Sequence, residues 1–174
     1  MQVFGRILDL TSGPDRAAVL PQIESGYLEV IDTYPKAPLV HEAYWRLMQM
    51  YVNDYSPPAF SKAEALYVRY RAAYPELKNQ NPVGDVLAEG YYRRGEWKKL
   101  LKFTSPAVKE FIQTGALARP HDLFLYTEAK YNLGDHVEAE KGYRIVAAKF
   151  PKAPQAAEAK QRLDAIRAKK EKKQ

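Results

Sequence analysis

Apolar residues recur at helical spacing in two neighbouring stretches near the end of the chain. In residues 121–133, HDLFLYTEAKYNL, they return every three or four positions, which predicts an amphipathic helix. Gly134 and Asp135 then signal a turn, because glycine favours a left-handed helix stop and aspartate caps the next helix. A second helix is expected over residues 136–150, and Pro151 ends it because the residue before a proline is pushed out of helical conformation. The pattern predicts a helical hairpin.

A further helix is expected over residues 154–170. Pro154 fixes a backbone angle suited to the first helical turn. The apolar positions form one face and charged residues fill the rest of the surface; these positions are Ala156, Ala159, Leu163 and Ile166. A helix of this kind covers the preceding hairpin with one side and faces water with the other, so we interpret it as a capping helix.

The chain carries the same phrase twice. Residues 34–47 read YPKAPLVHEAYWRL and residues 150–163 read FPKAPQAAEAKQRL. Related aromatic marks stand at Tyr34, Tyr74, Phe111 and Phe150, spaced by 40, 37 and 39 residues. Phe111 lacks the following proline, but Gly95 lies 16 residues before it, as Gly134 lies before Phe150. A period of this length indicates stacked helical hairpins that bury their apolar faces against one another.

The hairpins resemble the tetratricopeptide repeat (TPR). In that family a glycine between the helices is followed by a small residue, an aromatic, a small residue and a closing proline. The last hairpin has Gly134, Ala139, Tyr143, Val146 and Pro151 in that order. Ala63, Tyr67 and Pro75 also fit, although Tyr70 is large for the third position, and Ile23, Tyr27, Val30 and Pro35 fit more loosely. Residues 43–51, AYWRLMQMY, are close to the family's usual first helix.

The resemblance implies an all-α fold, a right-handed α-solenoid of TPR-like hairpins closed by the capping helix. We expect one domain over residues 1–170 and a basic tail over 171–174. Its units are expected at about 1–36, 37–76, 82–114 and 120–152, with the capping helix at 154–170. The joint between the units is similar to repeats of bacterial cell-envelope proteins, such as the lipoprotein of the outer-membrane β-barrel assembly machine and the coordinator of the Tol-Pal system.

A TPR-like stack would present a concave groove lined by the first helix of each unit. The family positions, carried over to this sequence, are Glu42, Trp45, Gln49, Asn53, Asp85, Glu89, Tyr92, Arg93, Phe124, Glu128, Tyr131 and Asn132. The aromatic members among them would anchor a partner, because aromatic residues are enriched at interface hot spots. Core packing between units is the alternative role for Tyr92 and Tyr131. Trp45 is favoured as a contact, because Tyr44, Leu47 and Tyr51 fill the packing positions beside it.

Three segments depart from the family pattern. Pro106 falls inside the expected second helix of the third unit, so we expect a break there, with Ser105 capping a short new helix. The turn at residues 54–60, DYSPPAF, is about three residues longer than usual. The first unit is expected to be partial, because residues 1–15 are too short for a full first helix.

Positive charge is concentrated at the C-terminal end of the chain. The net charge is +6, and residues 162–174 hold six basic and two acidic residues, so the body is expected to be near neutral. A solvated helix end explains the basic tail, since cations favour a helix C-terminus; contact with anionic lipid headgroups or nucleic acid is the alternative. Gly5, Arg6 and Asp9 fall within the stretch that would form the apolar core of a secretory signal, so none is expected. The sequence has no run of about 18 apolar residues, so no membrane span is expected.

Catalytic patterns are missing from the sequence. There is no cysteine, and His41, His121 and His136 fall in different units, without the spacing of metal ligands. No Ser/His/Asp arrangement and no glycine-rich phosphate loop is found. We therefore expect no enzyme, no cofactor and no metal, and a protein partner in place of a small-molecule substrate or nucleic acid.

Three functional hypotheses remain. The first is an interaction scaffold of a bacterial envelope assembly, which would place the protein in the periplasm if a leader precedes this sequence. The second is a cytoplasmic TPR adaptor or co-chaperone. The third is a TPR domain of a longer multidomain protein, which the partial first unit favours.

Overall fold

The computed structural model describes residues 13–79, 81–115 and 119–171, in which every regular element is a helix and no strand occurs. Helices that follow one another within residues 13–73, and within residues 97–171, pack against one another. The Cα packing divides the chain into two compact units, Met1–Gly90 and Tyr91–Gln174. The boundary falls within helix α5 (Pro82–Arg94).

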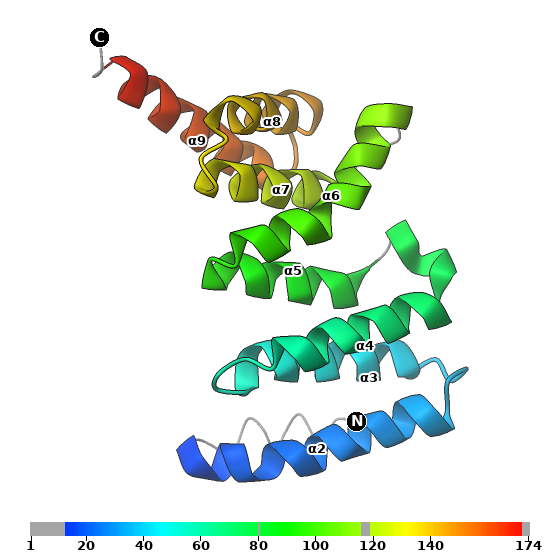
Figure 1. Ribbon diagram of the computed structural model, residues 1–174. Coiled ribbons are helices and arrows are strands. Elements are labelled where there is room, and N and C mark those ends of the chain that lie inside the picture. The colour runs from blue at the N-terminus through cyan, green and yellow to red at the C-terminus, as the bar shows by residue number, and fades with distance from the viewer. Residues whose placement is uncertain (1–12, 80, 116–118, 172–174) are drawn as a thin grey trace. The chain divides into compact units, whose positions relative to one another are not determined.

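The first unit is formed by α2 (Gly13–Thr33), α3 (Val40–Gln49), α4 (Phe60–Ala73) and the beginning of α5 (Figure 1). A π-helical turn, η1 (Met50–Asp54), extends α3, and a short 3-10 helix, η2 (Pro75–Asn79), follows α4. Helix α2 packs against α3, and α3 packs against α4. The unit's core includes Tyr27, Ile31, Leu47, Met48 and Tyr70.

The second unit holds the end of α5 and four further helices. These are α6 (Trp97–Thr114), α7 (Pro120–Asn132), α8 (His136–Lys149) and α9 (Pro154–Glu171). Each of the last three packs against the helix before it. The core includes Leu100, Val108, Leu125, Tyr143 and Val146. The predicted hairpin 121–150 and the predicted capping helix are confirmed as helices to within one residue.

The turn between α7 and α8 has the predicted chemistry. Gly134 has a φ of +89°, a left-handed conformation that glycine adopts without steric cost. The Asp135 side chain accepts a hydrogen bond from the backbone N–H of Glu138 at 3.3 Å, and this caps the start of α8. Lys130 of α7 also binds the Asp135 carboxylate, at 3.0 Å. The two residues read from the sequence therefore set where one helix stops and the next begins.

Small residues allow close helix packing at the positions expected from the repeat pattern. Ala63 in α4 and Ala139 in α8 are fully buried, each four residues before a tyrosine. Tyr143 is fully buried, whereas Tyr67 is half-buried and its hydroxyl accepts a hydrogen bond from Asn81 at 2.8 Å. The repeated tyrosine position is therefore used for packing in both units.

The break predicted at Pro106 is wrong. Helix α6 runs without interruption from Trp97 to Thr114, although its axis bends near its middle (Figure 1). Ser105 caps no new helix; its hydroxyl donates to the backbone carbonyl of Leu101. The helix continues because its buried residues lie on one face on both sides of the proline, so packing outweighs the missing hydrogen bond. Those buried residues are Leu100, Thr104, Val108 and Phe111.

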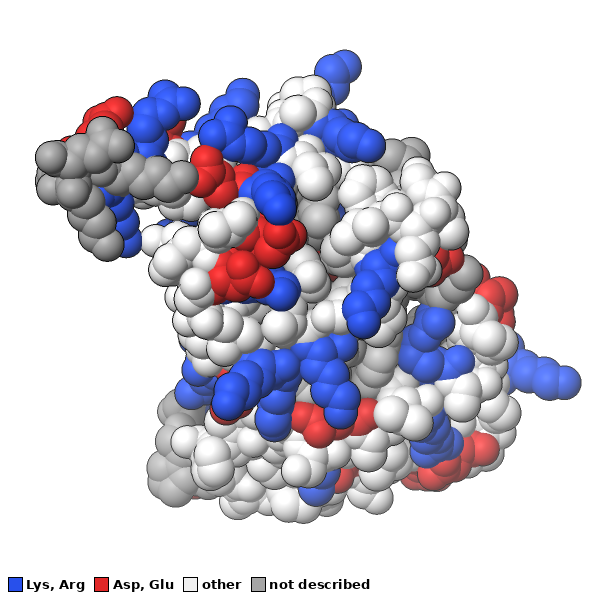
Figure 2. Space-filling view, turned by 45° about the horizontal axis from the view of Figure 1, so that its top comes forward, with Lys and Arg blue, Asp and Glu red and all other residues white. Residues whose placement is uncertain are grey.

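The charge is divided between the units. Residues 1–90 carry 8 Lys and Arg against 11 Asp and Glu, a net charge of −3. Residues 91–174 carry 19 against 10, a net charge of +9. The near-neutral body expected from the sequence is therefore an average of an acidic unit and a basic one. Lys and Arg are prominent on the face shown in Figure 2.

Two expectations concern residues outside the described part of the chain. The expectation that the first helical hairpin, at about 1–36, is partial depends on residues 1–12. Most of the expected basic tail, 171–174, lies beyond Glu171.

Candidate functional site

The predicted groove residues of α3 lie on the surface of the first unit. Glu42, Trp45 and Gln49 are half-buried. Arg46 joins the first two, because its Nε donates to Glu42 at 2.8 Å and its guanidinium lies 4.8 Å from the centroid of the Trp45 ring. Trp45 is therefore an accessible aromatic side chain beside an ion pair, as the sequence hypothesis requires. The other members in this unit are Asn53, which is exposed, and Asp85 and Glu89, which are half-buried.

In the second unit, the prediction that Phe124 and Glu128 line a groove and contact a partner is wrong. Phe124 is 4% exposed and Glu128 is 1% exposed, so neither side chain is accessible to a partner. Phe124 packs in the hairpin core, with its ring centroid 6.2 Å from that of Tyr143. The physical reason is that this face of α7 is used for packing within the unit. Tyr92 and Tyr131 are half-buried, and Arg93 and Asn132 are exposed.

Glu128 is the centre of a buried polar cluster. Its carboxylate accepts hydrogen bonds from the Tyr143 hydroxyl at 2.7 Å, from Arg162 Nε and Nη2 at 2.7 and 2.9 Å, and from the Tyr92 hydroxyl at 3.4 Å. Burial and the bond to Glu128 raise the pKa of Tyr143, and the bond to Glu128 raises the pKa of Arg162. The Glu128 cluster ties α7 to α5, α8 and α9, so its role is to hold the capping helix.

The repeated phrase contained a signal for this cluster. Arg46 and Arg162 occupy the same position of the two copies, and each binds a glutamate through its Nε. Arg46 binds Glu42 in its own helix, whereas Arg162 reaches Glu128 in another helix. The sequence marks the arginine, but it does not say which carboxylate the arginine meets.

A second polar cluster lies in the first unit around Glu24 of α2. Its carboxylate accepts hydrogen bonds from the hydroxyls of Tyr51 at 2.8 Å and Tyr55 at 2.6 Å, and Lys62 of α4 binds both oxygens at 2.8 Å. The Lys62 ammonium also lies 5.7 and 5.4 Å from the centroids of the two tyrosine rings. No sequence motif indicates this cluster, because its members come from α2, from α4 and from the segment around η1, which lie far apart in the chain.

Burial and hydrogen bonding compete in setting the pKa of Glu24. Partial burial raises it, but the hydrogen bonds from Lys62, Tyr55 and Tyr51 outweigh burial and leave the pKa below its usual value. Burial and the bond to Glu24 raise the pKa of Tyr55 to about 12. The cluster therefore favours an ionised carboxylate and neutral tyrosines at neutral pH.

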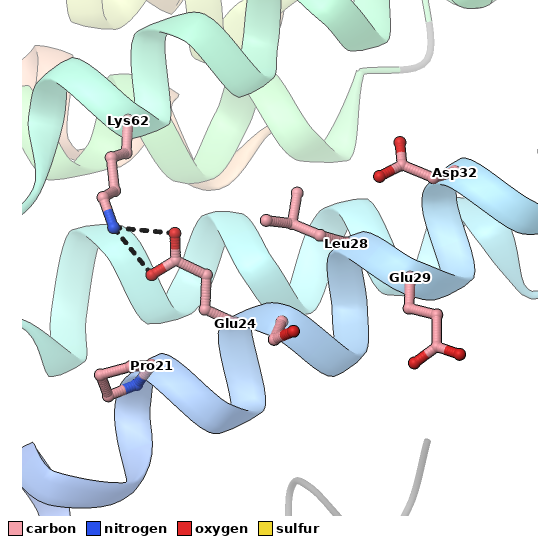
Figure 3. A pocket seen from close by; sticks show the side chains of 7 residues that line it. Pro21, Glu24, Leu28, Glu29, Asp32 and Lys62 are labelled. Atoms are coloured by element: carbon pink, nitrogen blue, oxygen red, sulfur yellow. Dashed lines mark hydrogen bonds and ion pairs between the residues drawn. The ribbon is translucent and has the colours of Figure 1, made fainter.

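An open pocket of about 620 Å³ runs along α2 beside this cluster (Figure 3). Its lining residues are Pro21, Glu24, Ser25, Leu28, Glu29, Asp32 and Lys62. Glu24 is bound by Lys62, and Asp32 is bound by Arg69. The lining places the apolar side chains of Pro21 and Leu28 among charged ones.

Acid titration tests the Glu24 cluster. A carboxyl whose pKa is lowered by folding stabilises the protein above its unfolded pKa, and that stabilisation is lost as the pH falls through the folded pKa. We expect Glu24→Gln to remove this part of the acid destabilisation and to lower the free energy of unfolding at pH 7 by about 1 kcal/mol. Urea unfolding at pH 7 and pH 4, followed by Trp45 fluorescence in a Trp97→Phe background, measures both.

The control for this titration is Glu29→Gln, because Glu29 is an exposed carboxylate on the same pocket wall. It should leave the acid profile unchanged. Equal effects of the two substitutions would contradict the assignment of the pH dependence to Glu24.

The described residues contain no group of three or more potential metal ligands. None of the described helices is long and apolar enough to cross a bilayer. No protein-family model, no curated protein and no solved structure matches the chain.

Proposed function

We propose that the protein is a non-enzymatic interaction scaffold, a TPR-like α-solenoid that binds a segment of a partner protein. The observation that carries the proposal is Trp45, a half-exposed aromatic on α3 beside the Arg46–Glu42 ion pair. An aromatic anchor with adjacent directional polar groups is typical of an interface hot spot. The succession of packed helices supports the solenoid. Repeat folds of this kind bind partners on surfaces formed by consecutive units.

Within this proposal, the envelope assembly is the first setting. The phrase that the chain carries twice, at residues 34–47 and 150–163, supports it through its similarity to repeats of envelope proteins. A cytoplasmic adaptor and a domain of a longer protein are the alternatives. Fractionation of the native host, with detection of the protein in envelope or cytosolic fractions, separates the first setting from the second.

Affinity capture with Trp45→Ala tests the binding surface. Loss of a hot-spot aromatic costs about 2 kcal/mol or more, so recovery of specific partners should fall by about thirtyfold. Val68→Ala is the matched control, since Val68 is an apolar side chain in the same unit that is 67% exposed. Both variants should keep the helical circular dichroism of the wild type. Identical partner lists for the wild type and Trp45→Ala would overturn the assignment of Trp45 as a contact.

A further inference from the structure

Three lysines on α6 form a positively charged face. Lys98, Lys102 and Lys109 stand at positions i, i+4 and i+11, which places them on one side of a helix. All three side chains are exposed, and among the described residues no hydrogen bond, ion pair or ring contact involves any of them. We call these residues the α6 lysine face. The neighbouring Lys99 is excluded, because it lies over the ring of Tyr91.

The α6 lysine face differs from the charged surface at the start of α8. On α8, Lys141 binds Glu138 and Arg144 binds Glu140, each at 2.7 Å. In contrast, the only acidic residue of α6 is Glu110. Lys141 and Arg144 of α8 are therefore compensated locally, whereas the α6 lysine face leaves an unbalanced positive potential at the surface.

We infer that the α6 lysine face docks a short acidic segment of a partner protein. The face spans at most about 16 Å, since a helix rises about 1.5 Å per residue. An extended chain covers that length with about five residues, at about 3.3 Å each. Ile112 lies 14 residues after Lys98, on the same side of α6, and is 69% exposed. The segment that fits is therefore a few carboxylates followed by an apolar residue.

Single-stranded nucleic acid fits this face less well. Such ligands need aromatic side chains beside the cations on which bases can stack. The aromatic residues of α6 are used within the unit instead. Trp97 packs against Tyr92, Phe103 packs against Tyr91, and Phe111 is buried.

A membrane surface also fits less well. An interfacial helix inserts its own apolar face below the headgroups. The apolar face of α6 is buried in its own unit and cannot insert, and the position between Lys102 and Lys109 on the lysine face is occupied by polar Ser105. An acidic protein segment needs only the exposed ammonium groups and a contact at Ile112.

Peptide binding to the whole chain of 174 residues tests this inference independently of Trp45. The probe is a fluorescein-labelled peptide of five glutamates followed by leucine, measured by fluorescence anisotropy in 50 mM salt. The triple variant Lys98→Gln, Lys102→Gln, Lys109→Gln should bind at least about tenfold more weakly, because three exposed charge contacts are lost. Binding by the wild type should also weaken strongly in 1 M salt, where the screening length falls to about 3 Å.

The matched control is Lys141→Gln, Arg144→Gln, Lys152→Gln, which removes the same amount of positive charge from the same unit. It should change peptide affinity by less than about twofold. Equal losses for the two triple variants, or no binding of the peptide, would overturn the inference. Tighter binding to phosphatidylserine vesicles or to a DNA duplex than to the peptide, with loss in the α6 variant, would also overturn it and would assign the face to that ligand.

Discussion

Replacing Glu128 by alanine is expected to lower the free energy of unfolding of the second unit by about 3 kcal/mol. The substitution leaves the buried Tyr143 hydroxyl without its acceptor and opens a cavity in α7. The side chain of Arg162 is 45% exposed, so its guanidinium can return to water, and this keeps the loss below that of a fully buried pair. Glu128→Gln keeps the shape and one acceptor, and it should cost about half as much.

The two tryptophans make this measurement specific. Trp97 lies in the second unit, half-buried against Tyr92, whereas Trp45 lies in the first. Urea unfolding in a Trp45→Phe background therefore reports on the second unit alone. Glu138→Ala is the control, because its ion pair with Lys141 is exposed, and it should cost less than about 1 kcal/mol. Similar losses for Glu128→Ala and Glu138→Ala would show that the Glu128 cluster does not hold the unit together.

Gly142→Ala is expected to destabilise the second unit by about 2 kcal/mol, although alanine favours a helix by about 1 kcal/mol over glycine. A Cβ at position 142 would overlap the Thr127 Oγ1 and come within 2.9 Å of the Thr127 Cγ2. Thr127 cannot easily move away, because it is buried and its hydroxyl donates to the Leu123 carbonyl at 2.7 Å. Helices α7 and α8 would have to separate.

A double-mutant cycle identifies the cause of that loss. Thr127→Ala removes the two Thr127 atoms closest to the new Cβ, so Thr127→Ala with Gly142→Ala should lose at least about 1 kcal/mol less than the sum of the two single variants. Lys141→Ala, on the exposed side of α8, should change stability by no more than about 0.5 kcal/mol. Strict additivity of the two substitutions would exclude the close contact as the origin of the effect.

The helices could be predicted from the sequence because their signals are local. The Gly134–Asp135 turn and the prolines at 151 and 154 act through the backbone of their own neighbours, and the structure has the helix ends there. The break at Pro106 was mispredicted for the opposite reason. Whether a helix survives a proline depends on what its far half packs against, and α6 buries Val108 and Phe111 beyond the proline.

The candidate site was less predictable, because it depends on which side of each helix faces a neighbour. Trp45 is accessible as expected, but Glu128 and Phe124 are buried in their unit. A glutamate is rarely buried unless it is paired, and its three partners lie 36, 15 and 34 residues away in the chain. No local pattern connects those positions. The division of charge between the units was hidden likewise, because it appears only once the boundary at Gly90 is known.

The division into an acidic unit and a basic unit has a consequence for the protein as a solute. With net charges of −3 and +9 on two parts of one chain, neighbouring molecules in dilute buffer attract one another through unlike parts despite their shared excess of positive charge. Added electrolyte weakens that attraction. Solubility should therefore rise with ionic strength at neutral pH, the salting-in that characterises chains with segregated charge.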